Sequence, residues 1–67
     1  MNDHIERMKI EHRDLVAKHA ALNAFIHGND LFKSLCDLEQ ARMIKQSGFM
    51  GAYAGVLEQR IWTAKGI

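Results

Sequence analysis

How this chain folds is decided by the stretch Ser47-Gly48-Phe49-Met50-Gly51-Ala52-Tyr53-Ala54-Gly55. In a helix, the four-residue spacing would place Ser47, Gly51 and Gly55 in one stripe that carries almost no side chain. Each glycine inside a helix costs roughly 1 kcal/mol relative to alanine, so the stripe indicates that something packs closely against it. The spacing favours a neighbouring helix, because small residues let two backbones approach. The alternative is a pocket at an interface between copies of the chain.

This stretch lies inside a segment that predicts a helix over residues 37–64. Its inward positions follow alternating steps of four and three residues, as in the seam of a coiled coil. They are Met43, Ser47, Met50, Ala54, Leu57 and Ile61. The sequence contains no proline, which favours long uninterrupted helices. Cys36 with Glu39 resembles a capping box at the start of the helix, and Gly66 follows Lys65 at its end.

A second seam predicts another long helix over residues 2–27. Its members are Ile5, Met8, His12, Leu15, His19, Leu22 and Ile26. We expect Gly28 to end this helix in the left-handed conformation that glycine adopts easily. A short turn of helix over residues 30–35 is then expected before the second long helix begins.

Together these segments predict an all-α fold in which residues 1–67 form one antiparallel helical hairpin with a short helical turn in the connection. Pairing residue 26 with about residue 43 places His19 near Met50. A chain of 67 residues is only marginally stable alone, and its single cysteine excludes an internal disulfide. Because two helices leave much of their apolar stripes uncovered, we expect the chain to assemble with itself into an oligomeric helical bundle.

Composition narrows the classes of function. Nine Lys and Arg residues against eight Asp and Glu residues give a net charge of +1, which argues against general nucleic-acid binding. No apolar run approaches the ~18 residues that span a bilayer, so no membrane association and a cytoplasmic location are expected. The sequence has no metal-ligand spacing, catalytic triad or phosphate loop. We therefore predict a protein that is not an enzyme and that holds no metal or cofactor.

Two histidines stand out on the first seam, because His12 and His19 lie two helical turns apart. One interpretation is a metal or anion site built across a symmetry axis. The other is structural, with both side chains partly buried and setting the register of the helices. The structural interpretation is favoured, since a metal site normally needs three or four ligands.

Residues spread over nearly the whole chain carry a resemblance to a known family. They are Glu6, Arg7, Met8, Glu11, Leu15, Lys18, Leu22, Asn23, Ala24, Phe25, Ile26, Phe32, Leu35, Glu39, Gln40, Gln46, Met50, Tyr53, Leu57, Arg60 and Ile61. In these residues the chain resembles the very short helical proteins of tailed phages that are related to one from crAss-like phages. The resemblance implies a phage origin, a helical hairpin and self-association. By analogy with other small phage proteins, it also implies counter-defence by sequestering a cyclic-nucleotide immune signal.

On this basis we predict a phage counter-defence protein that binds and sequesters a cyclic-nucleotide-type signal without catalysis in the infected host cell. The predicted ligand-binding residues are Arg7, His12, Tyr53 and Arg60, since arginine binds phosphate bidentately and tyrosine offers a stacking face. The predicted oligomer interface comprises His19, Ser47, Met50, Gly51, Ala54, Gly55 and Leu57. One alternative is a protein-interaction module that inhibits or scaffolds a host or phage protein through its exposed apolar helix face. Another is a structural accessory protein of the virion.

Overall fold

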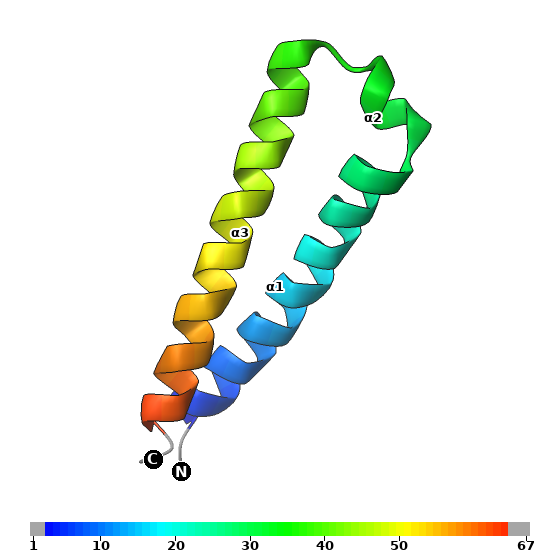
Figure 1. Cartoon of the computed structure of the whole chain (residues 1–67). Helices are drawn as coiled ribbons and strands as arrows, with labels where there is room; N and C mark the ends of the chain where they lie inside the picture. Colours follow the sequence, from blue (N-terminus) through cyan, green and yellow to red (C-terminus); the bar gives the residue numbers. More distant parts are fainter. Residues whose placement is uncertain (1–2, 65–67) are drawn as a thin grey trace.

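The computed structural model describes residues 3–64. It contains a long helix α1 (Asp3–Gly28), a short helix α2 (Asp30–Ser34) and a second long helix α3 (Asp37–Ala64). Helices α1 and α3 pack antiparallel and α2 lies in the connection at one end (Figure 1). The predicted all-α antiparallel hairpin is therefore confirmed. The predicted ends of the two long helices also involve residues outside the described range; they are residue 2, Lys65 and Gly66.

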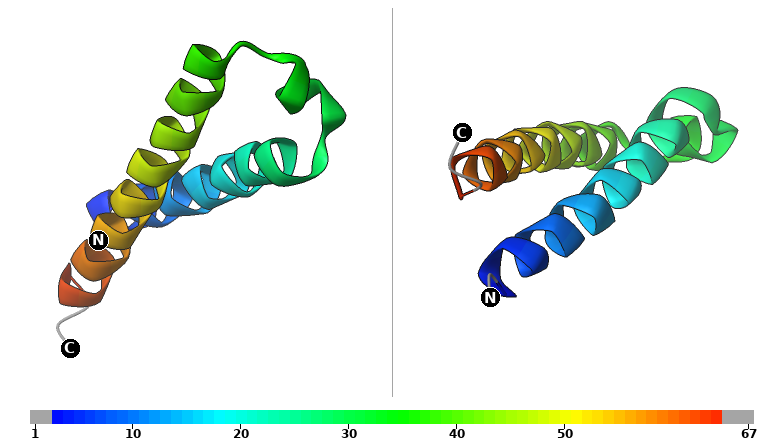
Figure 2. Two further views of the ribbon diagram at one scale, coloured as in Figure 1. Left: turned by 45° about the horizontal axis from the view of Figure 1, so that its top comes forward. Right: turned by 90° about the horizontal axis from the view of Figure 1, so that it is seen from below.

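The hairpin is long and narrow. Its principal extents are 48 × 15 × 14 Å and its radius of gyration is 15.0 Å, whereas a compact domain of this length would have a radius of about 11 Å. Figure 2 shows that α1 and α3 cross at an angle and do not run strictly side by side. Such a shape leaves most of each helix surface without a neighbour from the same chain.

The apolar core lies toward the start of α1 and the end of α3. It consists of Ile5, Met8, Leu57 and Ile61, with Leu15 and Ala64 packed against it. Leu57 is the most deeply buried of these, with 1% of its surface exposed. All four core residues belong to the predicted seams, so the three-and-four spacing identified the inward faces of both helices correctly.

The other end of the hairpin is closed by α2. Phe32 is buried there and packs edge-to-face on Phe25 of α1, with ring centroids 6.2 Å apart. The Asn29 side chain accepts a hydrogen bond of 2.9 Å from the backbone N–H of Leu31 and so caps α2. The Gln40 amide of α3 donates to the carbonyl oxygen of Leu35 over 2.8 Å, which ties the start of α3 to the connection.

The conformation predicted for Gly28 is wrong. Gly28 is the last residue of α1 and does not adopt the left-handed conformation. The reason is that the helical hydrogen-bond ladder continues past it, since the backbone N–H of Asn29 donates to the carbonyl oxygen of Phe25 over 3.3 Å. The direction of the chain changes instead at Asn29, whose backbone is extended.

Candidate functional site

A cluster of polar side chains joins the two long helices near the middle of the hairpin. His19 Nε2 lies 3.1 Å from Ser47 Oγ and 3.2 Å from Asn23 Nδ2. Ser47 Oγ in turn donates to Asn23 Oδ1. If Nε2 carries a proton it donates to Ser47, and if it does not it accepts from Asn23. Two of the three contacts are therefore hydrogen bonds in either tautomer.

This cluster explains part of the small-residue stripe that the sequence contains. A Cβ atom at Gly51 would lie 3.1 Å from Cε1 of His19, which is too close for an unstrained contact. Of the stripe Ser47, Gly51 and Gly55, for which close packing was expected, Gly51 thus has the ring of the other helix against it. At Gly48 and Gly55, by contrast, a Cβ atom would have no neighbour within 4 Å, so this part of α3 remains open.

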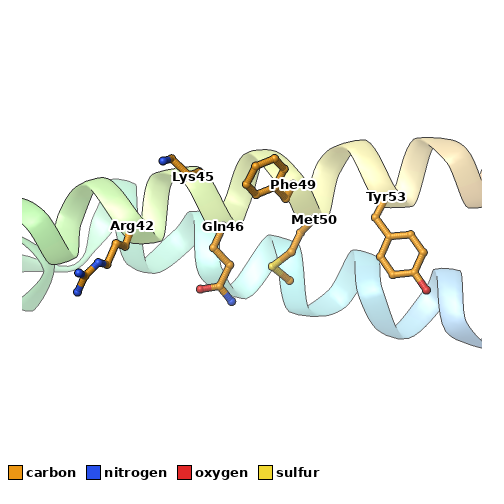
Figure 3. Close-up of a pocket in the computed structure, with 6 residues that line it drawn as sticks. All are labelled: Arg42, Lys45, Gln46, Phe49, Met50 and Tyr53. Carbon is orange, nitrogen blue, oxygen red and sulfur yellow. The ribbon is translucent and has the colours of Figure 1, made fainter.

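An apolar depression on the described surface is a shallow groove along α3, which we call the α3 groove. Its volume is about 510 Å³, within the range of small-molecule sites. The lining side chains all come from α3, where each has another three or four residues away (Figure 3); they are Arg42, Lys45, Gln46, Phe49, Met50 and Tyr53. The groove is open on its outer side, where Phe49 keeps 68% and Tyr53 45% of its surface exposed.

The four predicted ligand-binding residues line no common depression among those described on the hairpin. Tyr53 lines the α3 groove, whereas His12 lines a depression on the other edge of the hairpin together with Glu58 and Trp62. Arg60 lines a third depression. Arg7 is exposed on α1 and lines none of the three. A single site that uses all four would have to be completed by further copies of the chain.

The predicted oligomer-interface residues occupy different environments in the hairpin. Ser47, Ala54 and Leu57 are buried between α1 and α3, whereas Gly55 is exposed. The remaining three members, His19, Met50 and Gly51, are half-buried. An interface through this set would therefore present Gly55 and the exposed parts of the half-buried side chains to a second copy.

For three residues of these surfaces, the sequence predicted no role in a site. Asn23 completes the polar cluster, and Arg42 and Lys45 stand at one end of the α3 groove. A signal for the two cations was present, because they precede Phe49 by seven and four residues and so share its face of α3. Asn23 follows His19 by four residues, but its role depends on meeting Ser47 from the other helix.

Comparison with known proteins gives one informative result. The family model of Sequestin matches residues 2–63. The chain belongs to the Sequestin family. Neither a curated protein nor a solved structure matches it. The expected relationship was to the very short helical phage proteins related to one from crAss-like phages; of this, the match and the structure support a small all-helical protein.

Two further observations on the described residues concern membranes and metals. Within residues 3–64, no helix is long and apolar enough to cross a membrane. In the same part of the chain, no three His, Cys, Asp or Glu side chains gather where they would hold a metal ion. The features left to explain are the polar cluster, the α3 groove and the extent of exposed apolar surface. The large apolar side chains that remain exposed are Ile10, Val16, Leu31, Leu38, Ile44, Phe49, Tyr53, Val56 and Trp62.

Proposed function

We propose that this protein is a phage counter-defence factor that binds and sequesters a cyclic-nucleotide-type immune signal of the host cell without chemical conversion. The observation that carries the proposal is membership of the Sequestin family, whose name denotes sequestration. The resemblance to small helical phage proteins supplies the biological setting, in which the protein acts in the cytoplasm of the infected cell. Sequestration requires a complementary surface and no reacting group.

The surface of the hairpin is suited to such binding. Phe49, Tyr53 and Trp62 each expose about half or more of their surface, and aromatic faces of this kind stack on nucleobases. Arg7 and Arg60 are exposed as well, and an arginine side chain binds phosphate through two parallel hydrogen bonds. These residues supply the two chemistries that recognise a nucleotide, although they lie on different parts of one hairpin.

Self-association is part of the proposal, because it would bring such residues from different copies together. The single chain exposes 5155 Å² of surface, whereas a compact monomer of 7.6 kDa exposes roughly 4300 Å². The difference is similar to the area of about 800 Å² that each partner buries in a standard interface. The exposed apolar side chains on both long helices could form such an interface.

The proposal is tested by a thermal-shift panel of 3′,5′-cyclic di- and trinucleotides with the purified protein. A ligand that binds the folded state at about 100 times its Kd adds about 2.7 kcal/mol of stability. For a domain this small, that corresponds to a rise in Tm of roughly 10–20 °C. Mass spectrometry of the ligand released on heating should find it intact. The absence of a shift with every nucleotide would refute the proposal.

A second candidate function is favoured by the exposed apolar side chains. In this alternative, the hairpin is a protein-interaction module that inhibits or scaffolds a host or phage protein. It predicts no nucleotide-dependent shift and a stable stoichiometric complex with one partner protein, measured by light scattering on purified components. The two candidates thus differ in the ligand that stabilises the folded hairpin.

A further inference from the structure

The α3 groove combines an apolar floor with a cationic end. Phe49, Met50 and Tyr53 provide the apolar side chains, and Arg42 and Lys45 contribute their aliphatic stems. The charged ends of Arg42 and Lys45 point to opposite sides of α3 (Figure 3). None of the six lining residues is an aspartate or a glutamate. An occupant of this groove therefore meets aromatic faces and positive charge, with no carboxylate to oppose an anion.

Neither cation is engaged elsewhere in the described part of the hairpin. Between residues 3 and 64, the ion pairs are those of Lys9 with Glu6 and of Arg13 with Asp14. Arg42 and Lys45 thus keep their charges available at the groove. They are three residues apart on α3, which places their Cα atoms on the face of the helix that carries Phe49.

Charge decides which occupant the groove fits. A second copy docked through a two-fold interface would present the same surface to itself. Each copy would then cover Arg42 and Lys45 of the other with a surface that contains no carboxylate. These side chains would lose hydration without gaining an anionic partner, which is unfavourable. A purely apolar helix would bury the floor but leave both cations without partners. A flat aromatic anion can stack on the apolar floor and also pair its negative charge with the cations at the rim.

We infer that the α3 groove binds a small nucleotide, with its base on Phe49 and Tyr53 and its phosphate at Arg42 and Lys45. This inference rests on the proposed function and assigns it a place on one helix. It gives Arg42 and Lys45 the phosphate-binding role and, of the four residues predicted from the sequence, keeps only Tyr53, with Arg7, His12 and Arg60 outside the groove. The floor of the groove provides stacking, and the rim selects for a negatively charged group.

Binding of 3′,5′-cyclic di- and trinucleotides by the full-length protein, measured by isothermal titration calorimetry, tests the assignment. Against the nucleotide that wild type binds best, Phe49→Ala should weaken the Kd on the order of ten- to a hundred-fold, the typical effect of losing one stacking contact. Arg42→Gln and Lys45→Gln should each weaken it about ten-fold and reduce its dependence on salt concentration. All three side chains are exposed, so circular dichroism should find the helices intact.

Matched controls use exposed residues of α2, outside the groove. Leu31→Ala removes an apolar side chain that is 65% exposed, and Lys33→Gln removes an exposed cation. Both should stay within about two-fold of the wild-type Kd, as is usual for surface substitutions outside a site. Trp62→Ala reports on the depression that contains His12.

The outcomes separate the inference from the proposed function. If wild type binds a nucleotide and the three groove variants bind it equally well, the function stands and the groove assignment is wrong, the more so if Trp62→Ala abolishes binding. A third outcome concerns the oligomer. If Phe49→Ala converts oligomers to monomers while addition of the nucleotide does not change the oligomeric state of wild type, a second copy occupies the groove and the assignment is overturned. If wild type binds no cyclic nucleotide, or only single-stranded RNA, both the function and the assignment fail.

Discussion

The imidazole ring of His19 on α1 lies directly against the backbone of Gly51 on α3. A Cβ atom at Gly51 would approach Cε1 of the ring to 3.1 Å. The same ring is held by Ser47, whose Oγ lies 3.1 Å from Nε2. The ring of His19 thus occupies the space that a side chain at position 51 would take, and the glycine leaves that space free.

Replacing Gly51 with alanine tests this pair. Alanine favours a helix by roughly 1 kcal/mol over glycine, but at this position the new methyl group must displace a ring that hydrogen bonds hold in place. Overpacking typically costs about 1–3 kcal/mol, so we expect Gly51→Ala to be neutral or destabilising in urea unfolding followed by circular dichroism.

Gly48 provides the matched control, since a Cβ atom there has no neighbour within 4 Å. Gly48→Ala should stabilise the hairpin by about 1 kcal/mol. Removing the ring by His19→Ala should make Gly51→Ala as favourable as Gly48→Ala. Equal gains at Gly48 and Gly51 with His19 present would contradict the close contact.

A second prediction concerns the hydrogen bonds of the polar cluster. Ser47→Ala removes the hydroxyl that donates to Asn23 Oδ1 and leaves this half-buried acceptor without its partner. The loss should cost about 1–3 kcal/mol of unfolding free energy, measured by urea titration at a fixed protein concentration.

The control is Ser34, which is exposed and donates to the carbonyl oxygen of Leu31 over 2.6 Å. Because water replaces the lost partner there, Ser34→Ala should change stability by less than about 0.5 kcal/mol. A combined Ser47→Ala, Asn23→Leu and His19→Leu variant should recover much of the loss, because an apolar cluster leaves no polar atom unpaired. An equal cost for both serines would argue against a contribution from the cluster.

The hairpin itself was predictable because it follows from local rules. Two seams with steps of three and four residues identify the inward face of each helix, and the short connection requires antiparallel packing. The register was predictable for the same reason. His19 was expected near Met50, and it contacts Ser47 and lies against Gly51 on either side of that residue.

The arrangement of the candidate site residues was less accessible from the sequence. The spacing of a seam predicts which residues point inward. It does not predict which flanking residues of the two helices lie on the same side of the hairpin. That depends on the crossing of the helices, and it separates His12 from Tyr53. Arg42 and Lys45 have no seam position. Their spacing from Phe49 places them on its face of α3, but that this face forms a groove follows only from the shape of the surface.

A third prediction concerns the apolar core near the start of α1. Leu57 is 1% exposed and contacts the cluster of Ile5, Met8 and Ile61. Leu57→Ala should cost about 2–5 kcal/mol, a large part of the total stability of a small domain. Thermal unfolding followed by circular dichroism measures the effect. Leu38→Ala, at a side chain that is 60% exposed, should change stability by less than about 0.5 kcal/mol, and a comparable loss at both positions would contradict the assigned core.

The last prediction concerns self-association. Light scattering at micromolar concentration should find more than one copy per particle, and the Tm should rise with protein concentration, because assembly stabilises the folded state by mass action.

Gly55 is the predicted interface residue that the hairpin leaves fully open, with nothing within 4 Å of an added Cβ atom. Gly55→Leu should therefore preserve the helical circular dichroism signal while shifting the particles toward monomers. Ala21→Leu, at an exposed position of α1 outside the predicted interface, should leave the particle size unchanged. A stable folded monomer with a concentration-independent Tm would exclude assembly, and an assembled Gly55→Leu variant would place the interface elsewhere on the exposed apolar surface.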